Sequence, residues 1–510
     1  MDYIDLVDNA RLEFAFSMTS HHVWVPIYLG AALVAAILET LYVTTGRIDY
    51  KTSAMYISKM LLPTFIVIIF LGIATPPFSD DWTVWWSYVK VLDPEDLTGR
   101  IPSTLIVVTL IAFITSQAGW KRLPPKIHVV ATWVLPLMPA IAESSAIAVN
   151  GWMHAPHTTS SFDLDTMMYV RDSFSAYFFQ PMTALRFAHN FAATYIVGIA
   201  AVLSMSCYFL LRNKHAFFVQ KTVLIASISG LIFSLFLAVA GDEQGRAVAE
   251  TQPMKLAQLE ALWETDADPH LVLFAIPDME EMTNKYEISV PYILGFLLGS
   301  DEENPIKGIK QLLDENEQRV RSGMIAYQAM QEFQQDRSNQ EAEQRLLAHH
   351  KDLGFAYLLG KYTDDILSAT DADIKNAAKD TMTNVSFLFF SFRIMVGLGI
   401  LLTGVFAYWS VKSYKNSLDT ASPWVIKFSM LALPMALVAY LVGWALSEVG
   451  RQPWIIYEVL PTFTGGGNYQ NGQSAGFPIG TLVTITTVLF SSLSLYIAWL
   501  IRRGPQLTDK

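Results

Sequence analysis

Nine long apolar segments constrain the fold of this chain more than any other feature of its sequence. Each is roughly 20 residues long, the length that a helix needs to cross a bilayer. They begin near Phe16, Met60, Ile101, His128, Phe187, Thr222, Val385, Trp424 and Gly480. Because lipid offers no partner for backbone polar groups, we expect an all-α polytopic membrane protein with about nine transmembrane helices. A composition of 52% hydrophobic and only 16% charged residues agrees with this class.

The charges in the connections between these segments predict the orientation in the membrane. Basic and acidic connections alternate along the chain, and the basic ones carry Arg47, Lys51, Lys59, Lys121, Arg122, Lys126, Arg212, Lys214, Lys221, Lys412 and Lys415. Because basic loops stay in the cytoplasm, we predict an outer N-terminus and a cytoplasmic C-terminus. The connections at 80–96 and 163–172 then face outward. A formal net charge of −11 argues against nucleic acid as a partner.

The chain divides into three regions. Residues 1–240 hold six predicted helices, residues 241–382 form one large outward loop, and residues 383–510 hold three more helices. Most of the loop is typical of a solvated outer domain, with surface helices predicted over 314–351. Lys255 and Glu260 lie five residues apart, so we expect them to project at adjacent angles from a helix. There they could bind a quinol hydroxyl while the carboxylate accepts its proton.

Residues 447–454 place a carboxylate and a guanidinium, Glu448 and Arg451, at the end of the apolar segment 431–446. Ionisable groups at membrane depth are costly and usually serve a ligand, a proton or a charged cofactor edge. The alternative is an interfacial ion pair that caps a helix. Both interpretations stay open from this stretch alone.

His21 and His189 lie in the outer parts of their predicted helices, where each could bind haem iron. A hydrogen-bonded packing role is the alternative for each. Met395 could supply a thioether as second axial ligand, although methionine in an apolar helix usually fills the core. Arg393 needs an anion inside its helix, and a haem propionate is one. Cys207 is the only cysteine, which excludes an intrachain disulfide.

Gly450-Arg451-Gln452-Pro453-Trp454 resembles the signature of subunit I of the cytochrome bd quinol oxidases. The similarity runs over residues 11–461 and includes Asn150-Gly151-Trp152-Met153. In that family an outward "Q-loop" carries a lysine and a glutamate at the spacing of Lys255 and Glu260. The resemblance implies an electrogenic quinol:oxygen oxidoreductase in a bacterial inner membrane.

The same resemblance implies the cofactors and partners. His189 and Met395 would be the axial ligands of a low-spin haem b, and His21 and Glu448 would be ligands of a high-spin haem b and a haem d. Arg393, Arg451 and Trp454 would lie beside the cofactors. Quinol and dioxygen are the implied substrates, and the implied partners are a second membrane subunit and sometimes a short single-helix one.

Two departures from the family pattern concern the handling of protons. The family carries Glu-Phe-Gln-Phe-Gly-Thr-Asn-Trp before its third helix, where this chain has different residues at 76–82, and two glutamates within that helix, where residues 101–119 are without an acidic residue. Glu143 on the fourth helix is a candidate replacement, or a packing residue. The chain is therefore expected to be a bd-type oxidase subunit. The alternative is a quinol-linked cytochrome b paralogue, with an electron-transfer or assembly role, that lacks the oxygen-reducing haem d site.

Overall fold

The computed structural model describes residues 3–74, 97–465 and 479–506. Within these ranges nine helical spans are long and apolar enough to cross a membrane, as the sequence predicted. They are built from α1 (Tyr3–Thr45), α2 (Ile48–Ala74), α4 (Leu97–Ala118), α5 (Pro125–His154), α7 (Pro181–Leu211), α8 (Ala216–Thr251), α15 (Val385–Tyr414), α16 (Pro423–Ser429) with α17 (Ala432–Val449), and α18 (Ile479–Arg503). The stretch at 76–82 and most of the predicted outward connection at 80–96 lie outside the described residues.

Small residues let the central helices approach closely. A Cβ atom added at Gly30 of α1 would lie 2.6 Å from the Cα atom of Gly198 on α7. Close packing of this kind holds helices together in lipid, where burial of apolar side chains adds little. The largest buried cluster around this crossing is formed by side chains from α1, α2, α4, α5, α7, α8, α15, α16 and α17. The bundle therefore offers a rigid frame for polar groups at its ends.

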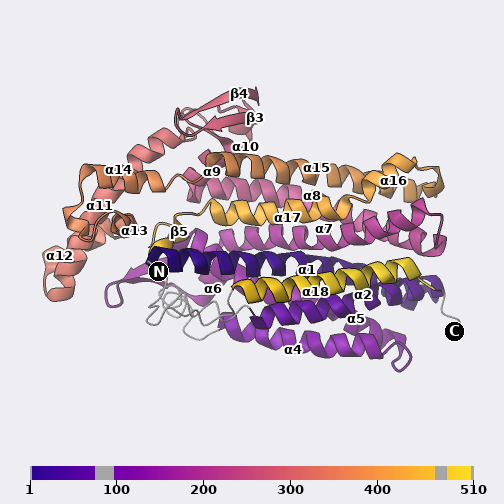
Figure 1. The fold of residues 1–510 in the computed structure, drawn as a ribbon. Coiled ribbons are helices and arrows are strands. Elements are labelled where there is room, and N and C mark those ends of the chain that lie inside the picture. The colour runs from indigo at the N-terminus through magenta and orange to yellow at the C-terminus, as the bar shows by residue number, and fades with distance from the viewer. Residues whose placement is uncertain (1–2, 75–96, 466–478, 507–510) are drawn as a thin grey trace.

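The two ends of the bundle differ. The N-terminus lies at the end that also carries the large polar segment, and the C-terminus lies at the opposite end (Figure 1). Helix α8 continues to Thr251, so the polar segment leaves the bundle ten residues beyond position 241. The cytoplasmic placement of the basic connections remains a prediction.

The polar segment is mainly helical and includes one long antiparallel hairpin. Its elements are α9 (Pro253–Glu260), β3 (Leu271–Asp278), β4 (Thr283–Val290), α10 (Ile293–Leu298), α11 (Ile309–Gln335), α12 (Gln340–His349), α13 (Leu353–Leu358) and α14 (Asp371–Asp380). Helices α11 and α12 occupy the predicted surface-helix region, yet each buries one apolar face, with Val320, Phe333 and Leu346 among the buried residues. Shorter elements near the same end are β1 (Ser160–Asp163), β2 (Met168–Arg171), α6 (Phe174–Phe178), β5 (Trp454–Ile456) and β6 (Leu460–Pro461).

An ion-pair network of Arg319, Asp352 and Glu458 connects the polar segment to the turn that follows α17. Arg319 of α11 donates two hydrogen bonds to the Glu458 carboxylate, at 2.5 and 2.8 Å, and one to Asp352 at 2.8 Å. Its guanidinium also lies 4.2 Å from the ring centroid of Phe355. The neighbouring carboxylate of Glu458 raises the pKa of Arg319, although burial acts against this. The network fixes the polar segment beside residues 450–458.

Candidate functional site

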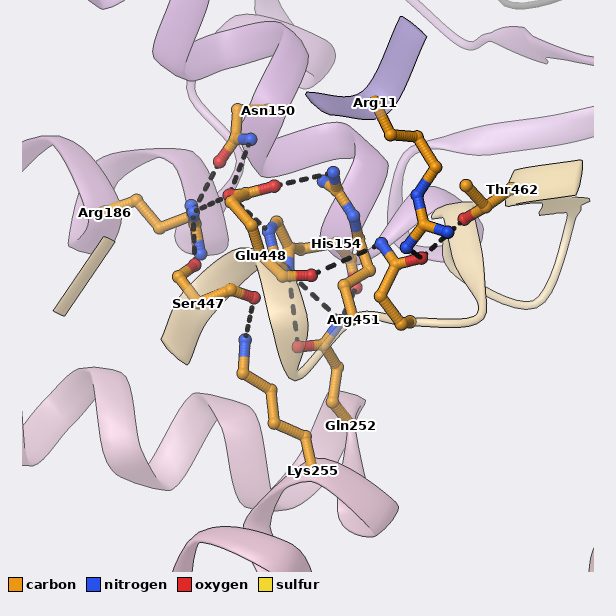
Figure 2. Close-up of polar contacts among 11 residues, drawn as sticks. Arg11, Asn150, His154, Arg186, Gln252, Lys255, Ser447, Glu448, Arg451 and Thr462 are labelled. Atoms are coloured by element: carbon orange, nitrogen blue, oxygen red, sulfur yellow. Dashed lines mark hydrogen bonds and ion pairs between the residues drawn. The ribbon is translucent and has the colours of Figure 1, made fainter. Parts of the chain in front are cut away.

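A polar cluster surrounds Glu448 in the last turn of α17 (Figure 2). Its Oε2 atom lies 2.6 Å from Nη2 of Arg451, and its Oε1 atom lies 3.5 Å from Nη2 of Arg186 and 3.5 Å from Nε2 of His154. Asn150 donates a hydrogen bond of 3.2 Å to the same Oε1 atom and accepts one from Arg186. Three segments, α5, α7 and the end of α17, thus converge on one carboxylate.

Positive charge exceeds negative charge in this cluster. Lys255, Arg186 and Arg451 lie around Glu448, and Lys255 and Arg451 are buried. Burial holds the pKa of the Lys255 ammonium well below its usual range, and the nearby guanidinium of Arg186 lowers it further. The Nε and Nη1 atoms of Arg451 have no hydrogen-bond partner among the described residues. Unpaired buried cations are costly, so the cluster suits a bound anionic group such as the carboxylates of a haem.

Lys255 and Glu260 both lie on α9 but contact different helices. Lys255 donates a hydrogen bond of 2.9 Å to the carbonyl of Ser447, whereas Glu260 pairs with Arg393 at 2.7 Å. The expectation of adjacent angles is therefore wrong. Five residues at 3.6 per turn place two side chains about 140° apart around the axis.

Arg393 holds α9 and β3 against α15. Besides Glu260, its guanidinium donates to the carbonyl of Leu259 and, at 2.6 and 3.1 Å, to that of Val272. It also lies 3.7 Å from the ring centroid of Phe389. Burial raises the pKa of the Glu260 carboxyl, and Arg393 opposes that shift. Glu260 thus supplies one anion to Arg393. The haem propionate suggested by the sequence stays a prediction.

A small pocket opens beside Lys255, between α9, α11, α13, the residue that follows α14, and the turn after α17. The residues that line it are Met254, Lys255, Gln258, Asn316, Phe355, Thr381, Gly450, Gln452, Trp454, Tyr457 and Glu458. Trp454 is buried in one wall and packs against Phe355 with ring centroids 5.2 Å apart. The sequence predicted Trp454 beside a cofactor, and the structure places it in a hydrophobic cluster between the turn and α13.

His189 and Met395 each face a glycine on a neighbouring helix. A Cβ atom added at Gly241 of α8 would lie 3.5 Å from Nδ1 of His189, and this buried nitrogen has no hydrogen-bond partner among the described residues. A Cβ atom added at Gly443 of α17 would lie 2.8 Å from the Met395 sulfur. An available imidazole nitrogen and a thioether are donor types that serve as axial ligands of a haem.

His21 lies on α1 and is half-buried. Its neighbour His22 donates a hydrogen bond of 2.6 Å from Nδ1 to the carbonyl of Met18 and stacks on Trp444 of α17, with ring centroids 5.2 Å apart. Tyr440 lies 5.8 Å from the His22 ring, centroid to centroid. The histidine pair is therefore held against α17, the helix that ends in Glu448.

Glu143 lies on α5, seven residues before Asn150. Asn190 of α7 donates a hydrogen bond of 2.9 Å to its carboxylate and accepts one of 3.1 Å from Tyr440. Seven helical residues correspond to a rise of about 10 Å. Glu143 is therefore a separate polar position about two turns deeper in the bundle than the Glu448 cluster.

Sequence reasoning missed three members of the site: His22, His154 and Arg186. His154 is fully buried at the end of α5 and hydrogen-bonded to Gln252. Their positions in the sequence could have identified them, since all three lie in apolar helices, where a polar side chain needs a partner.

These features define a class of protein, a multi-span membrane protein with a buried cluster of carboxylate, guanidinium and imidazole groups at one end. The described residues contain no cluster of three or more histidine, cysteine, aspartate or glutamate side chains that could hold a metal ion. Haem iron needs only one or two protein ligands, so it does not require such a cluster.

The chain belongs to the cytochrome bd terminal oxidase subunit I family, whose model matches residues 9–505. It is 30% identical to the cytochrome bd-II ubiquinol oxidase subunit 1 of Escherichia coli (strain K12), over 98% of this chain and 97% of the relative. It is 25% identical to the cytochrome bd ubiquinol oxidase subunit 1 of Bacillus subtilis (strain 168), over 89% and 84%.

A solved structure shows the same fold. The bd oxidase from Geobacillus thermodenitrificans superposes with a TM-score of 0.75 and 20% identity, over 99% of this chain and 100% of that one. The predicted family, helical membrane fold and terminal oxidase class are thereby confirmed.

Proposed function

We propose that this chain is the haem-binding subunit of a quinol oxidase that oxidises quinol beside α9 and reduces dioxygen to water. The observation that carries the proposal is the buried excess of positive charge around Glu448, directly beside the pocket at Lys255. It suits two ligands at once, an anionic cofactor edge and a quinol head group. Family membership and the names of both relatives support the same reaction.

Four residues are proposed to hold the haems. His189 and Met395 are the axial ligands of a low-spin haem b, and His21 and Glu448 are ligands of a high-spin haem b and a haem d. The haems, once bound, would carry electrons from quinol to the iron at which dioxygen is reduced. Arg451 is proposed to bind a haem carboxylate through the Nε and Nη1 atoms that lack a partner within the described chain.

Lys255 and Glu260 are proposed to remove the protons of quinol. The lowered pKa of Lys255 eases loss of its proton, and the amine can then accept a hydrogen bond or a proton from a quinol hydroxyl. The raised pKa of Glu260 makes its carboxylate a stronger base than an exposed one. Because the two side chains point about 140° apart, each serves a different face of α9. Arg393 is then a positioning residue for Glu260.

Apolar surface remains for lipid and partners. Exposed side chains on α4 include Ile106, Val107, Ile111 and Ile114. We propose that a second membrane subunit, and in some complexes a short single-helix subunit, covers part of such surface. The complex is proposed to lie in the bacterial inner membrane, with the α9 end outward and the Q-loop formed by residues 241–382.

The sequence of α4 favours a second candidate function. Leu97–Ala118 contains no acidic residue, although the family is expected to carry two glutamates there. A quinol-linked cytochrome b paralogue that contains no haem d would have no need of them. This alternative keeps quinol oxidation and the low-spin haem.

The first experiment is purification of the native complex, a reduced-minus-oxidised spectrum, haem extraction and quinol-dependent oxygen uptake. A haem d band with oxygen uptake supports the oxidase. Low-spin haem b alone supports the paralogue, and no haem refutes both. Met395→Leu should abolish the low-spin signature. Met205→Leu, a buried methionine in the core of α7, should leave it unchanged.

A further inference from the structure

The hairpin of β3 and β4 and the short helix α10 expose apolar side chains on the outside of the polar segment. The exposed side chains include Phe274, Ile276, Tyr286, Ile288, Tyr292 and Phe296. Phe274 and Ile288 are register partners in the hairpin, so the exposed apolar surface extends across both strands. An exposed apolar patch of this kind marks a surface that contacts a partner or a membrane.

Helix α10 turns an apolar face outward. Ile293, Phe296 and Leu297 are spaced so that they share one face of the helix, and all three are exposed, Phe296 by 82%. Leu294 and Gly295, on the other side, are buried. Because the apolar face of a helix in water normally packs against a core, the exposed face of α10 needs an apolar environment outside the chain.

Two hydrogen bonds fix the position of the hairpin along α15. The carbonyl of Val272 accepts from Arg393 at 2.6 and 3.1 Å, and the carbonyl of Pro277 accepts from Ser386 at 3.2 Å. Seven helical residues correspond to a rise of about 10 Å, so β3 runs alongside the first turns of α15. The turn at 279–282, which contains two glutamates, therefore lies toward the beginning of α15. The opposite end of the hairpin, which leads into α10, lies further along the bundle.

The exposed patch adjoins the apolar stripes of two membrane spans. The stripe on α8 is made of exposed residues on one helix face, Ile228, Ile232, Leu235 and Val239. The stripe on α15 repeats every seven residues, at Phe387, Ile394 and Leu401. Strand β3 packs against α15 and α10 packs against α8, and Figure 1 shows the hairpin and α10 at the side of the bundle. The patch therefore continues the surface that these two spans present to lipid.

The polar groups of the hairpin limit how deep it can lie. Within the described residues β3 and β4 form a two-stranded sheet, so β4 keeps one open edge. Open edges are excluded from the hydrocarbon of a bilayer but are satisfied in the head-group layer. Exposed tyrosines, here Tyr286 and Tyr292, are typical of that layer.

We propose that residues 271–298 form an interfacial anchor that lies in the head-group layer of the bilayer. The exposed face of α10 contacts the upper acyl chains, and the turn at 279–282 stays in water. The inference depends on the membrane-spanning fold and is independent of the oxidase reaction. Arg393 bonds both Val272 and Glu260, so the anchor also holds Glu260 at a fixed depth relative to the lipid.

The test places a thiol-reactive fluorophore at position 296 of the complete complex in lipid nanodiscs. Cys207 is the only cysteine of the chain and is buried, so Phe296→Cys supplies the accessible thiol. The unsubstituted complex, treated with the same fluorophore, gives the background from other chains. Leu347→Cys is the matched control, because it is a 44% exposed apolar position on α12 of the same polar segment. Ile232→Cys on α8 is the reference for a label in lipid.

Two quenchers report the environment of the label, a phosphatidylcholine with a nitroxide near its head group and aqueous iodide. We expect the nitroxide lipid to quench the label at position 296 about threefold more than the label at position 347, and iodide to act in the opposite order. Iodide quenching as strong at position 296 as at 347 would place α10 in water and overturn the proposal. Protection from both quenchers would show that a second subunit or a second copy covers α10, and would also overturn it. If Phe296→Cys fails to assemble, Ile288→Cys, at a 61% exposed position of β4, is judged by the same criteria.

Discussion

Substitution of Glu260 by glutamine separates a structural role from a proton-accepting role. The amide keeps the size of the side chain and one acceptor oxygen but loses the charge. Arg393 retains the carbonyl of Val272, so it is not left without partners. A charge-assisted hydrogen bond contributes about 1.5–3 kcal/mol and a neutral one about 0.5–1.5 kcal/mol. We therefore expect a structural loss of about 1–2 kcal/mol, which corresponds to about five- to thirtyfold in an equilibrium.

Loss of a proton acceptor has a larger effect on the rate. General base catalysis contributes about 10²- to 10⁴-fold. The assay is anaerobic stopped-flow reduction of low-spin haem by quinol, with dithionite reduction as the measure of intact haem. We expect Glu260→Gln to slow quinol reduction by at least a hundredfold while dithionite reduction stays unchanged. The control is Glu264→Gln, a glutamate on the same segment whose side chain is 72% exposed.

The pH dependence supplies a second readout. Burial raises the pKa of Glu260, and only its carboxylate form accepts a proton. Lowering the pH through this raised pKa protonates the group, so the wild-type rate should fall toward acid pH. The acidic limb should disappear in Glu260→Gln. A variant that keeps more than a tenth of the wild-type rate and retains the acidic limb would refute the assignment of Glu260 as the proton acceptor.

Two further substitutions test the ligand space and the attachment of the polar segment. Gly443→Ala places a methyl group 2.8 Å from the Met395 sulfur, so the low-spin haem spectrum should change, whereas Gly241→Ala makes only ordinary contacts and should not alter it. Arg319→Met breaks a bidentate, partly buried ion pair and should destabilise the polar segment by about 2–3 kcal/mol, measured by hydrogen exchange in α11. Arg321→Met removes an exposed pair and should cost less than about 1 kcal/mol; equal protection in both variants would contradict this account.

The sequence predicted the helical bundle because each membrane-spanning helix can be recognised from the hydropathy of its own residues. Nine spans follow from apolar length alone, and the polar segment follows from the interruption of that pattern. Glu448 with Arg451 was also accessible, since three residues of separation bring the two side chains together at the end of α17.

Contacts between helices were not accessible in the same way. His154 lies almost 300 positions before Glu448, and no periodicity along the chain reports that α5 and α17 end side by side. The pairing of Arg393 with Glu260 was inaccessible for a related reason. A membrane guanidinium indicates that some anion is near, but it does not reveal whether that anion is a cofactor or the side chain of Glu260.

Helix α9 lies between the proposed quinol pocket and both groups of proposed haem ligands. On one side, Lys255 is bonded to Ser447, whose chain neighbour is Glu448. On the other side, Glu260 is bonded to Arg393, two residues from Met395. A quinol that takes either hydrogen bond must therefore displace a contact to α17 or to α15. Because the displaced partner adjoins a ligand residue, quinol binding should shift the spectrum of the corresponding haem before any electron is transferred.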